Sequence, residues 1–138
     1  MRHITCLRLL LLLPCLHVAS CGTAPERISG TDLPTIPRVT LSSSQVTASK
    51  ASIATDGTFM FTGPVYDALE RLRWISRAYV DAGWTPQRPE GTPSKATQVF
   101  SKPTKKLDLK RSVTITAVAS RTTGSVEVEL HSEPLASE

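Results

Sequence analysis

Apolar residues between positions 64 and 82 recur every three or four positions, the spacing that places them on one face of an α-helix. Pro64 suits the first turn of a helix, where its missing N–H has no intrahelical partner to lose. Gly83 suits the left-handed position just past a helix end. The pattern therefore predicts an amphipathic helix over residues 64–82. Its inward stripe comprises Val65, Ala68, Leu69, Leu72, Ile75, Ser76, Tyr79 and Ala82.

Two stretches near the C-terminus alternate apolar and polar residues, as strands with one buried face do. They are 112–120 and 125–131, joined by a turn over 121–124. If Ser120 pairs with Ser125, the apolar residues of both strands fall on one face of the hairpin. We therefore expect a hairpin with a buried face onto which the helix packs. The expected apolar pairs are Ala119 with Val126, Ala117 with Val128, and Ile115 with Leu130.

Shorter segments elsewhere are also candidate strands. Asp56-Gly57 is a dipeptide favoured in tight hairpin turns, because both residues tolerate positive φ. Residues 51–55 are therefore a candidate partner for the strand that follows this turn. The other candidate strands are 58–61, 84–88, 96–100 and 106–110, with a turn at 101–104 between the last two.

These elements predict an α+β fold. The expected architecture is a two-layer sandwich, in which one amphipathic helix packs on an antiparallel sheet. The expected order is β-α-β-β-β-β, and an additional N-terminal hairpin before the helix stays open. The strands do not alternate with helices, as they would in a parallel sheet. We expect this domain to occupy residues 51–134 and to be followed by a disordered tail, 135–138.

The segment before this domain has the composition of a linker. Residues 21–50 are rich in Thr, Ser and Pro, and proline disfavours helix there. The segment is therefore expected to be an extended tether. However, residues 38–41 alternate like a short strand, so whether residues 38–55 belong to the tether or to the sheet stays open.

The first 20 residues have the parts of a secretory signal. Arg2 and Arg8 supply positive charge, and the apolar run that follows is about ten residues long, about half of what a membrane-spanning helix needs. Val18-Ala19-Ser20-Cys21 then closes the segment with small residues and a cysteine.

This ending resembles the lipobox of bacterial lipoproteins. The resemblance implies that the signal peptide 1–20 is removed and that the thiol of Cys21 receives a diacylglyceryl group, often with acylation of the new amino group. Two or more acyl chains anchor a protein stably to a bilayer. In enteric-type bacteria an aspartate after the cysteine tends to retain a lipoprotein at the inner membrane. Gly22 therefore favours the outer membrane, facing the periplasm, over the inner membrane.

Loss of the signal changes the charge and the cysteine content. The chain has 16 Lys and Arg residues against 12 Asp and Glu residues, and two of the basic residues leave with the signal. Cys6 and Cys15 leave too, and lipid occupies Cys21, so the mature protein forms no disulfide. A nearly neutral exported domain is not expected to bind nucleic acid.

Side chains suited to catalysis or metal binding are few. His131 is the one histidine after the signal, it is expected on the solvent face of its strand, and no Gly-x-Ser-x-Gly motif accompanies it. The sequence after Cys21 has neither the Cys/His set of a zinc site nor the acidic loop of a calcium site. We therefore expect no catalytic residue, metal or cofactor.

Two groups of residues are candidate partner-binding surfaces. Arg73 and Arg77 lie off the apolar stripe of the helix, and Trp74 lies beside it, where we expect it to pack at the border of the core. An exposed Trp74 would instead serve as an anchor for a partner, because Trp and Arg often dominate the energetics of protein interfaces. The second group is a cluster of positive charge, suited to anionic lipid headgroups, lipopolysaccharide or an acidic protein surface, or simply to protecting a strand edge. It comprises Lys102, Lys105, Lys106, Lys110 and Arg111.

The sequence thus predicts a non-enzymatic lipoprotein, anchored to the bilayer through Cys21, that binds another envelope protein as a subunit of a secretion, pilus or outer-membrane assembly. One alternative is an immunity or inhibitor lipoprotein that neutralises an exported toxin. A second alternative is a small hydrolase or ligand carrier with a cleft near His131.

The lipid anchor can be tested by replacing the sulfur of Cys21. Cys21→Ser replaces the thiol that the lipid transfer requires, so we expect loss of fatty-acid labelling and accumulation of the unprocessed precursor. Metabolic labelling with a palmitate analogue, together with gel mobility, measures both, and Cys15→Ser is the matched control. Normal membrane retention of the Cys21→Ser protein would refute the lipid anchor.

Overall fold

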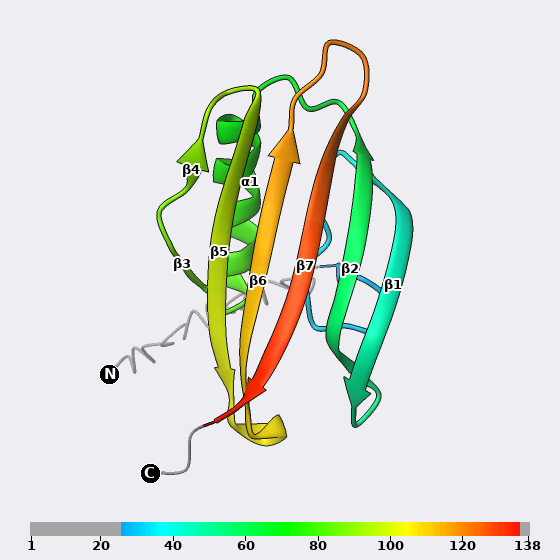
Figure 1. Cartoon of the computed structure of the whole chain (residues 1–138), viewed down its shortest axis with the longest axis vertical. Helices are drawn as coiled ribbons and strands as arrows, with labels where there is room; N and C mark the ends of the chain where they lie inside the picture. Colours follow the sequence, from blue (N-terminus) through cyan, green and yellow to red (C-terminus); the bar gives the residue numbers. More distant parts are fainter. Residues whose placement is uncertain (1–25, 136–138) are drawn as a thin grey trace, which may run out of the picture.

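The structure, a computed structural model, describes residues 26–135. Its main elements are one antiparallel sheet and one long helix (Figure 1). Cys21 and residues 136–138 lie outside this range. The α+β class is confirmed, and two strands precede the helix, so the additional N-terminal hairpin left open by the sequence is present. Across the sheet the strand order is β1-β2-β7-β6-β5-β3, and β4 also pairs with β5. The elements are β1 (Thr40–Lys50), β2 (Ile53–Gly63), α1 (Ala68–Asp81), β3 (Thr85–Pro86), β4 (Glu90–Gly91), β5 (Lys95–Thr104), the 3-10 turn η1 (Lys105–Leu107), β6 (Leu109–Val118) and β7 (Gly124–Pro134).

Helix α1 forms where the apolar periodicity predicts it. It begins after Asp67, whose side chain accepts a hydrogen bond from the backbone N–H of Glu70 at 2.9 Å and so satisfies one free donor of the first turn. Pro64 precedes this cap and is not part of the helix. Gly83 adopts a φ of +86° just beyond the last turn, as expected for a helix stop. The buried face of the helix consists of Ala68, Leu72, Ile75 and Tyr79.

The β6–β7 hairpin has the expected faces but not the expected register. Ser125 lies opposite Val118, so the pairing of Ser120 with Ser125 is wrong by two residues. The backbone N–H of Ser120 instead donates to the carbonyl of Val65 at 2.8 Å, which draws the chain out of the hairpin. Because side chains alternate with a period of two, a shift of two residues keeps the apolar positions on the buried face. The observed apolar pairs are Ala117 with Val126, Ile115 with Val128, and Val113 with Leu130.

The first hairpin turns at Ala51 and Ser52, which adopt φ values of +50° and +63°, and the turn expected at Asp56-Gly57 is wrong. Gly57 lies inside β2, where a Cβ atom would stand 2.7 Å from the carbonyl oxygen of Gln45 on β1. Glycine is therefore required here for the close approach of a neighbouring strand rather than for a turn.

The segment between helix and hairpin also differs from the expected one. Only two residues of the expected strand at 84–88 pair with the sheet, as β3. The expected turn at 101–104 is wrong, because these residues belong to β5. Since β3 pairs only with Phe100 and Ser101, β5 is an edge strand beyond them, and an edge strand tolerates Pro103. The turn is η1, closed by Asp108 at a φ of +54°. The strand expected at 106–110 therefore begins only at Leu109 and continues as β6.

Residues 26–50 are part of the fold, and the expected tether is wrong for them. Ile28, Leu33 and Ile36 are buried in the core, and the carbonyl of Gly30 accepts a hydrogen bond at 3.0 Å from the N–H of Ala54 on β2. Residues 40–50 form β1, so the domain starts well before residue 51. The three buried side chains follow neither a helix nor a strand period, so the sequence pattern did not separate them from a linker.

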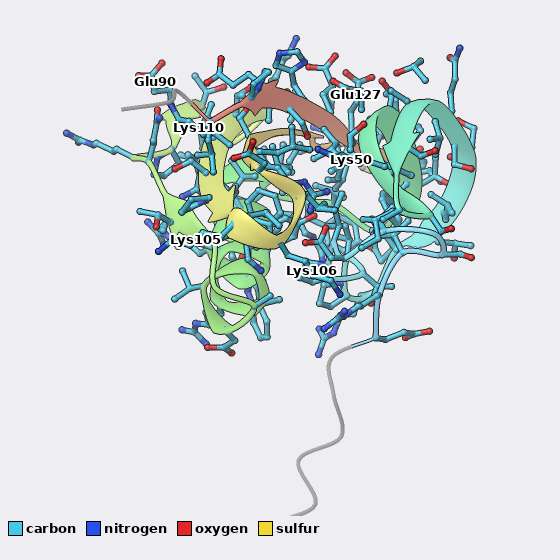
Figure 2. The ribbon with its side chains drawn as sticks, turned by 90° about the horizontal axis from the view of Figure 1, so that it is seen from below. Lys50, Glu90, Lys105, Lys106, Lys110 and Glu127 are labelled. Carbon is cyan, nitrogen blue, oxygen red and sulfur yellow. The ribbon has the colours of Figure 1, made fainter. Side chains whose placement is uncertain are left out.

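The sheet has one covered and one open face. Figure 2 shows α1 and the N-terminal segment, residues 26–39, on the same side of the sheet. The opposite face carries no other element of residues 26–135. Inward residues of the four central strands form the core with these two segments. The sheet contributes Ala54, Phe59 and Phe61 from β2, Ala96 and Phe100 from β5, Val113, Ile115 and Ala117 from β6, and Val126, Val128 and Leu130 from β7.

The place of the N-terminal segment in the core can be tested with two leucines. Leu33→Ala empties a fully buried position, so we expect the free energy of unfolding to fall by about 3 kcal/mol. Leu41→Ala is the control, since Leu41 is exposed on β1 and its truncation should cost less than about 1 kcal/mol. Urea unfolding followed by circular dichroism measures both. Equal, small losses would show that the segment is a tether after all.

Candidate functional site

The outward face of α1 carries an arginine–tryptophan cluster. Arg73 and Arg77 are exposed, as the helical pattern predicts. Trp74, expected at the border of the core, is instead 48% exposed. The guanidinium carbon of Arg77 lies 5.9 Å from the centroid of the Trp74 ring. That of Arg38 lies 5.5 Å from the same centroid. These distances fit cation–π contacts, which hold the arginines beside an exposed aromatic ring.

Arg38 was not expected in this cluster. It lies just before β1, 36 positions from Trp74, and it adopts a φ of +62°, which is uncommon for a residue with a Cβ atom. The turn passes close to Gly63, where a Cβ atom would stand 3.1 Å from the Arg38 carbonyl oxygen. No periodicity links these positions, so only the folded chain brings Arg38 to the helix.

A pocket of about 210 Å³ lies beside Trp74 at the N-terminal end of α1. Arg71 forms part of its wall and donates hydrogen bonds to the carbonyls of Pro37, at 3.0 Å, and Pro64. Burial lowers the pKa of Arg71, and the positive charge of Arg38 lowers it further, while Glu70 acts in the opposite direction. The pocket is lined by Arg38, Pro64, Tyr66, Asp67, Glu70, Arg71 and Trp74.

A second hollow, of about 590 Å³, adjoins the other side of the cluster. Arg73 and Arg77 line it together with Val80, which is also exposed. Gln98 of β5 lies in its wall, almost fully buried, and donates to the carbonyl of Gln87 at 2.8 Å. The Oε1 atom of Gln98 has no hydrogen-bond partner among residues 26–135. A buried acceptor of this kind gains from a donor supplied by a bound molecule.

The lysine-rich candidate surface is only partly assembled. Lys105, Lys106 and Lys110 are exposed around η1, where Figure 2 also places Lys50 from the end of β1. The ammonium of Lys50 donates to the carbonyl of Leu107 at 2.7 Å. Lys110 is paired with Glu133 at 3.4 Å between their charged atoms. Half of these cations are therefore engaged in contacts within the domain.

Two residues of that surface have structural roles. The ammonium of Lys102 donates to the carbonyl of Ala82 at 2.7 Å, where it places a cation at the C-terminal end of α1. Arg111 occupies an inward position of β6 and is fully buried, so its expected place on a binding surface is wrong. Its guanidinium pairs with Asp32 and donates to the carbonyl of Ala54 at 3.0 Å. The sequence prediction failed because an arginine in a basic run is usually solvated.

His131 is exposed, as expected. Its Nδ1 atom lies 2.9 Å from Oδ1 of Asp56 on the neighbouring strand, and the same oxygen accepts the N–H of Ser132 at 3.2 Å. Asp56 therefore orients the end of β7 rather than forming a turn.

Within the described part of the chain, no three His, Cys, Asp or Glu side chains gather as a metal site. Among the same residues, no helix is long and apolar enough to cross a bilayer. Comparisons with protein-family models, curated proteins and solved structures find no match to the chain.

The role of Arg111 can be tested through its partner. Asp32→Ala leaves a fully buried guanidinium without its carboxylate, so we expect the free energy of unfolding to fall by about 3 kcal/mol or more. Glu133→Ala is the matched control, because it breaks the exposed pair with Lys110 and should cost less than about 1 kcal/mol. Urea unfolding compares the two variants. Similar small losses would mean that Arg111 is solvated.

Proposed function

We propose that this protein is a lipid-anchored envelope lipoprotein that binds another envelope protein through the outward face of α1. The observation that supports this proposal most directly is Trp74, half exposed and in contact with Arg38 and Arg77. Exposed aromatic and arginine side chains are enriched at protein interfaces, where a few of them supply most of the binding energy.

We further propose that α1 and the sheet act as a two-layer sandwich that holds this surface rigid. The helix packs on β5 and β6 through Leu72, Ile75 and Tyr79, which are fully buried. A side chain on a packed helix keeps its position at little entropic cost when a partner binds. The hollows on either side of the cluster offer places for the partner's own side chains.

A lipid on the thiol of Cys21 would hold the domain close to its membrane. Only five positions separate Cys21 from Glu26, and a chain spans at most about 3.6 Å per residue, so the reach is no more than about 20 Å. The N-terminal segment lies on the same face of the sheet as α1 (Figure 2). A partner at the surface of the same membrane, preferentially the outer membrane on its periplasmic side, suits this short reach.

The surface can be tested by photo-crosslinking in cells that express the full chain. A photoreactive amino acid at Val80, on the α1 face, should capture one envelope protein. The same amino acid at Val46, on β1, is the matched control because the two valines are 47% and 49% exposed. Trp74→Ala should weaken the captured complex by tenfold or more, since interface tryptophans contribute about 2 kcal/mol or more.

His131→Ala serves as the control for the enzyme or carrier alternative, and it should leave crosslinking and cellular activity unchanged. Loss of activity in that variant with the crosslink intact would contradict a binding role. The identity of the captured protein separates an assembly subunit from an inhibitor, because an inhibitor would capture an exported toxin.

A further inference from the structure

The backbone conformation of Arg38 and its contact with the Trp74 ring both restrict the position of the Arg38 side chain. Its left-handed φ of +62° is a conformation that costs energy for a residue other than glycine, and such residues cluster at binding sites. Its guanidinium stacks on the Trp74 ring at 5.5 Å. Arg38 is exposed and forms no ion pair with another residue of 26–135. An arginine fixed in this way loses little side-chain freedom when it binds an anion.

The walls of the pocket restrict the charge of that anion. Arg71 adds positive charge, while its hydrogen bonds to Pro37 and Pro64 keep it in the wall. Asp67 and Glu70 also line the pocket, and one oxygen of Asp67 already accepts the N–H of Glu70. Two arginines against two carboxylates leave the lining without net charge, so the attraction for an anion comes from Arg38, which has no ion-pair partner among residues 26–135. A doubly charged phosphate would be repelled by Glu70 and Asp67 more strongly than a single carboxylate.

The size of the pocket restricts the ligand further. A volume of about 210 Å³ is below the roughly 300–1,000 Å³ of pockets that enclose whole small molecules. It suits one side chain of a larger partner. The surface continues past Trp74 to Arg73 and Arg77, beyond the reach of a single small ligand.

We propose that the pocket formed by Arg38, Arg71, Tyr66 and Trp74 receives an acidic side chain of the partner protein. Arg38 donates hydrogen bonds to the carboxylate, Trp74 supports the guanidinium from below, and Tyr66 covers the aliphatic part of the side chain. This inference rests on the proposed function, and it identifies the chemistry that the partner must present at one end of α1.

The test uses the full chain purified in detergent and labelled with ¹⁵N at its two tryptophan indoles. The probe is N-acetylglutamate α-methylamide, which carries one side-chain carboxylate, and N-acetylglutamine α-methylamide is its neutral isostere. We expect saturable shifts of the Trp74 indole signal with the glutamate probe only. Arg38→Gln should weaken binding about tenfold or more, because hydrogen bonds to charged groups contribute about 1.5–3 kcal/mol.

Lys106→Gln is the matched control, since it removes a positive charge at η1, away from the N-terminal end of α1, and should leave the affinity unchanged. Glycerol phosphate tests the alternative of a lipid headgroup. Tighter binding of glycerol phosphate than of the glutamate probe would overturn the inference. Equal shifts with the glutamine probe would do the same.

The crosslinking experiment separates this inference from the proposed function. If Val80 captures a partner whose yield is unaffected by Arg38→Gln, the carboxylate site is wrong and the binding surface stands. If the glutamate probe binds and no partner is captured at Val80, the proposed function fails while the chemistry of the pocket stands.

Discussion

The ion pair between Arg111 and Asp32 ties the N-terminal segment, residues 26–39, to β6 in the interior of the domain. Arg111 occupies a position on β6 that alternation assigns to the core, and it is fully buried there. A buried guanidinium needs a carboxylate and further acceptors, and Asp32 and the carbonyl of Ala54 partner its two terminal nitrogens, while Nε has no partner among residues 26–135. The N-terminal segment, β2 and β6 are therefore bound to one another at a single point.

Trp84 and Tyr79 connect this ion pair to the helix. The guanidinium carbon of Arg111 lies 5.6 Å from the Trp84 ring centroid, and the Trp84 and Tyr79 centroids are 6.0 Å apart. Burial raises the pKa of Tyr79, and the negative charge of Asp32 raises it further, so the phenol stays neutral. Because Tyr79 belongs to α1, the position of the helix depends on the same cluster that holds the N-terminal segment.

The short stretch of chain before the fold limits how far a lipid-anchored domain would stand from the membrane. A chain that enters the fold by residue 27, where Arg27 pairs with Pro34, leaves little length between an acylated Cys21 and the sheet. With the proposed lipid at Cys21, the domain would be held near the bilayer rather than on a long flexible arm.

Much of the fold follows from local patterns. The helix was predictable because its apolar residues keep a period near 3.6, and the faces of β6 and β7 were predictable because alternation survives a two-residue shift. The register was not, since Ser120 leaves the hairpin to bond Val65, a contact between segments 55 positions apart. Gly57 was misassigned for a related reason: its small size serves a neighbouring strand rather than a turn.

The residues of the candidate site also fall into two groups: those predicted from local sequence and those placed only by the fold. The sequence by itself determined the amphipathic helix and the exposure of Arg73 and Arg77, because each depends on neighbours within about one helical turn. Only the tertiary structure decided that Arg38 joins Trp74, that Arg111 is buried, and that residues 26–39 complete the core. Those outcomes depend on contacts between distant segments, and such contacts leave no period in the sequence.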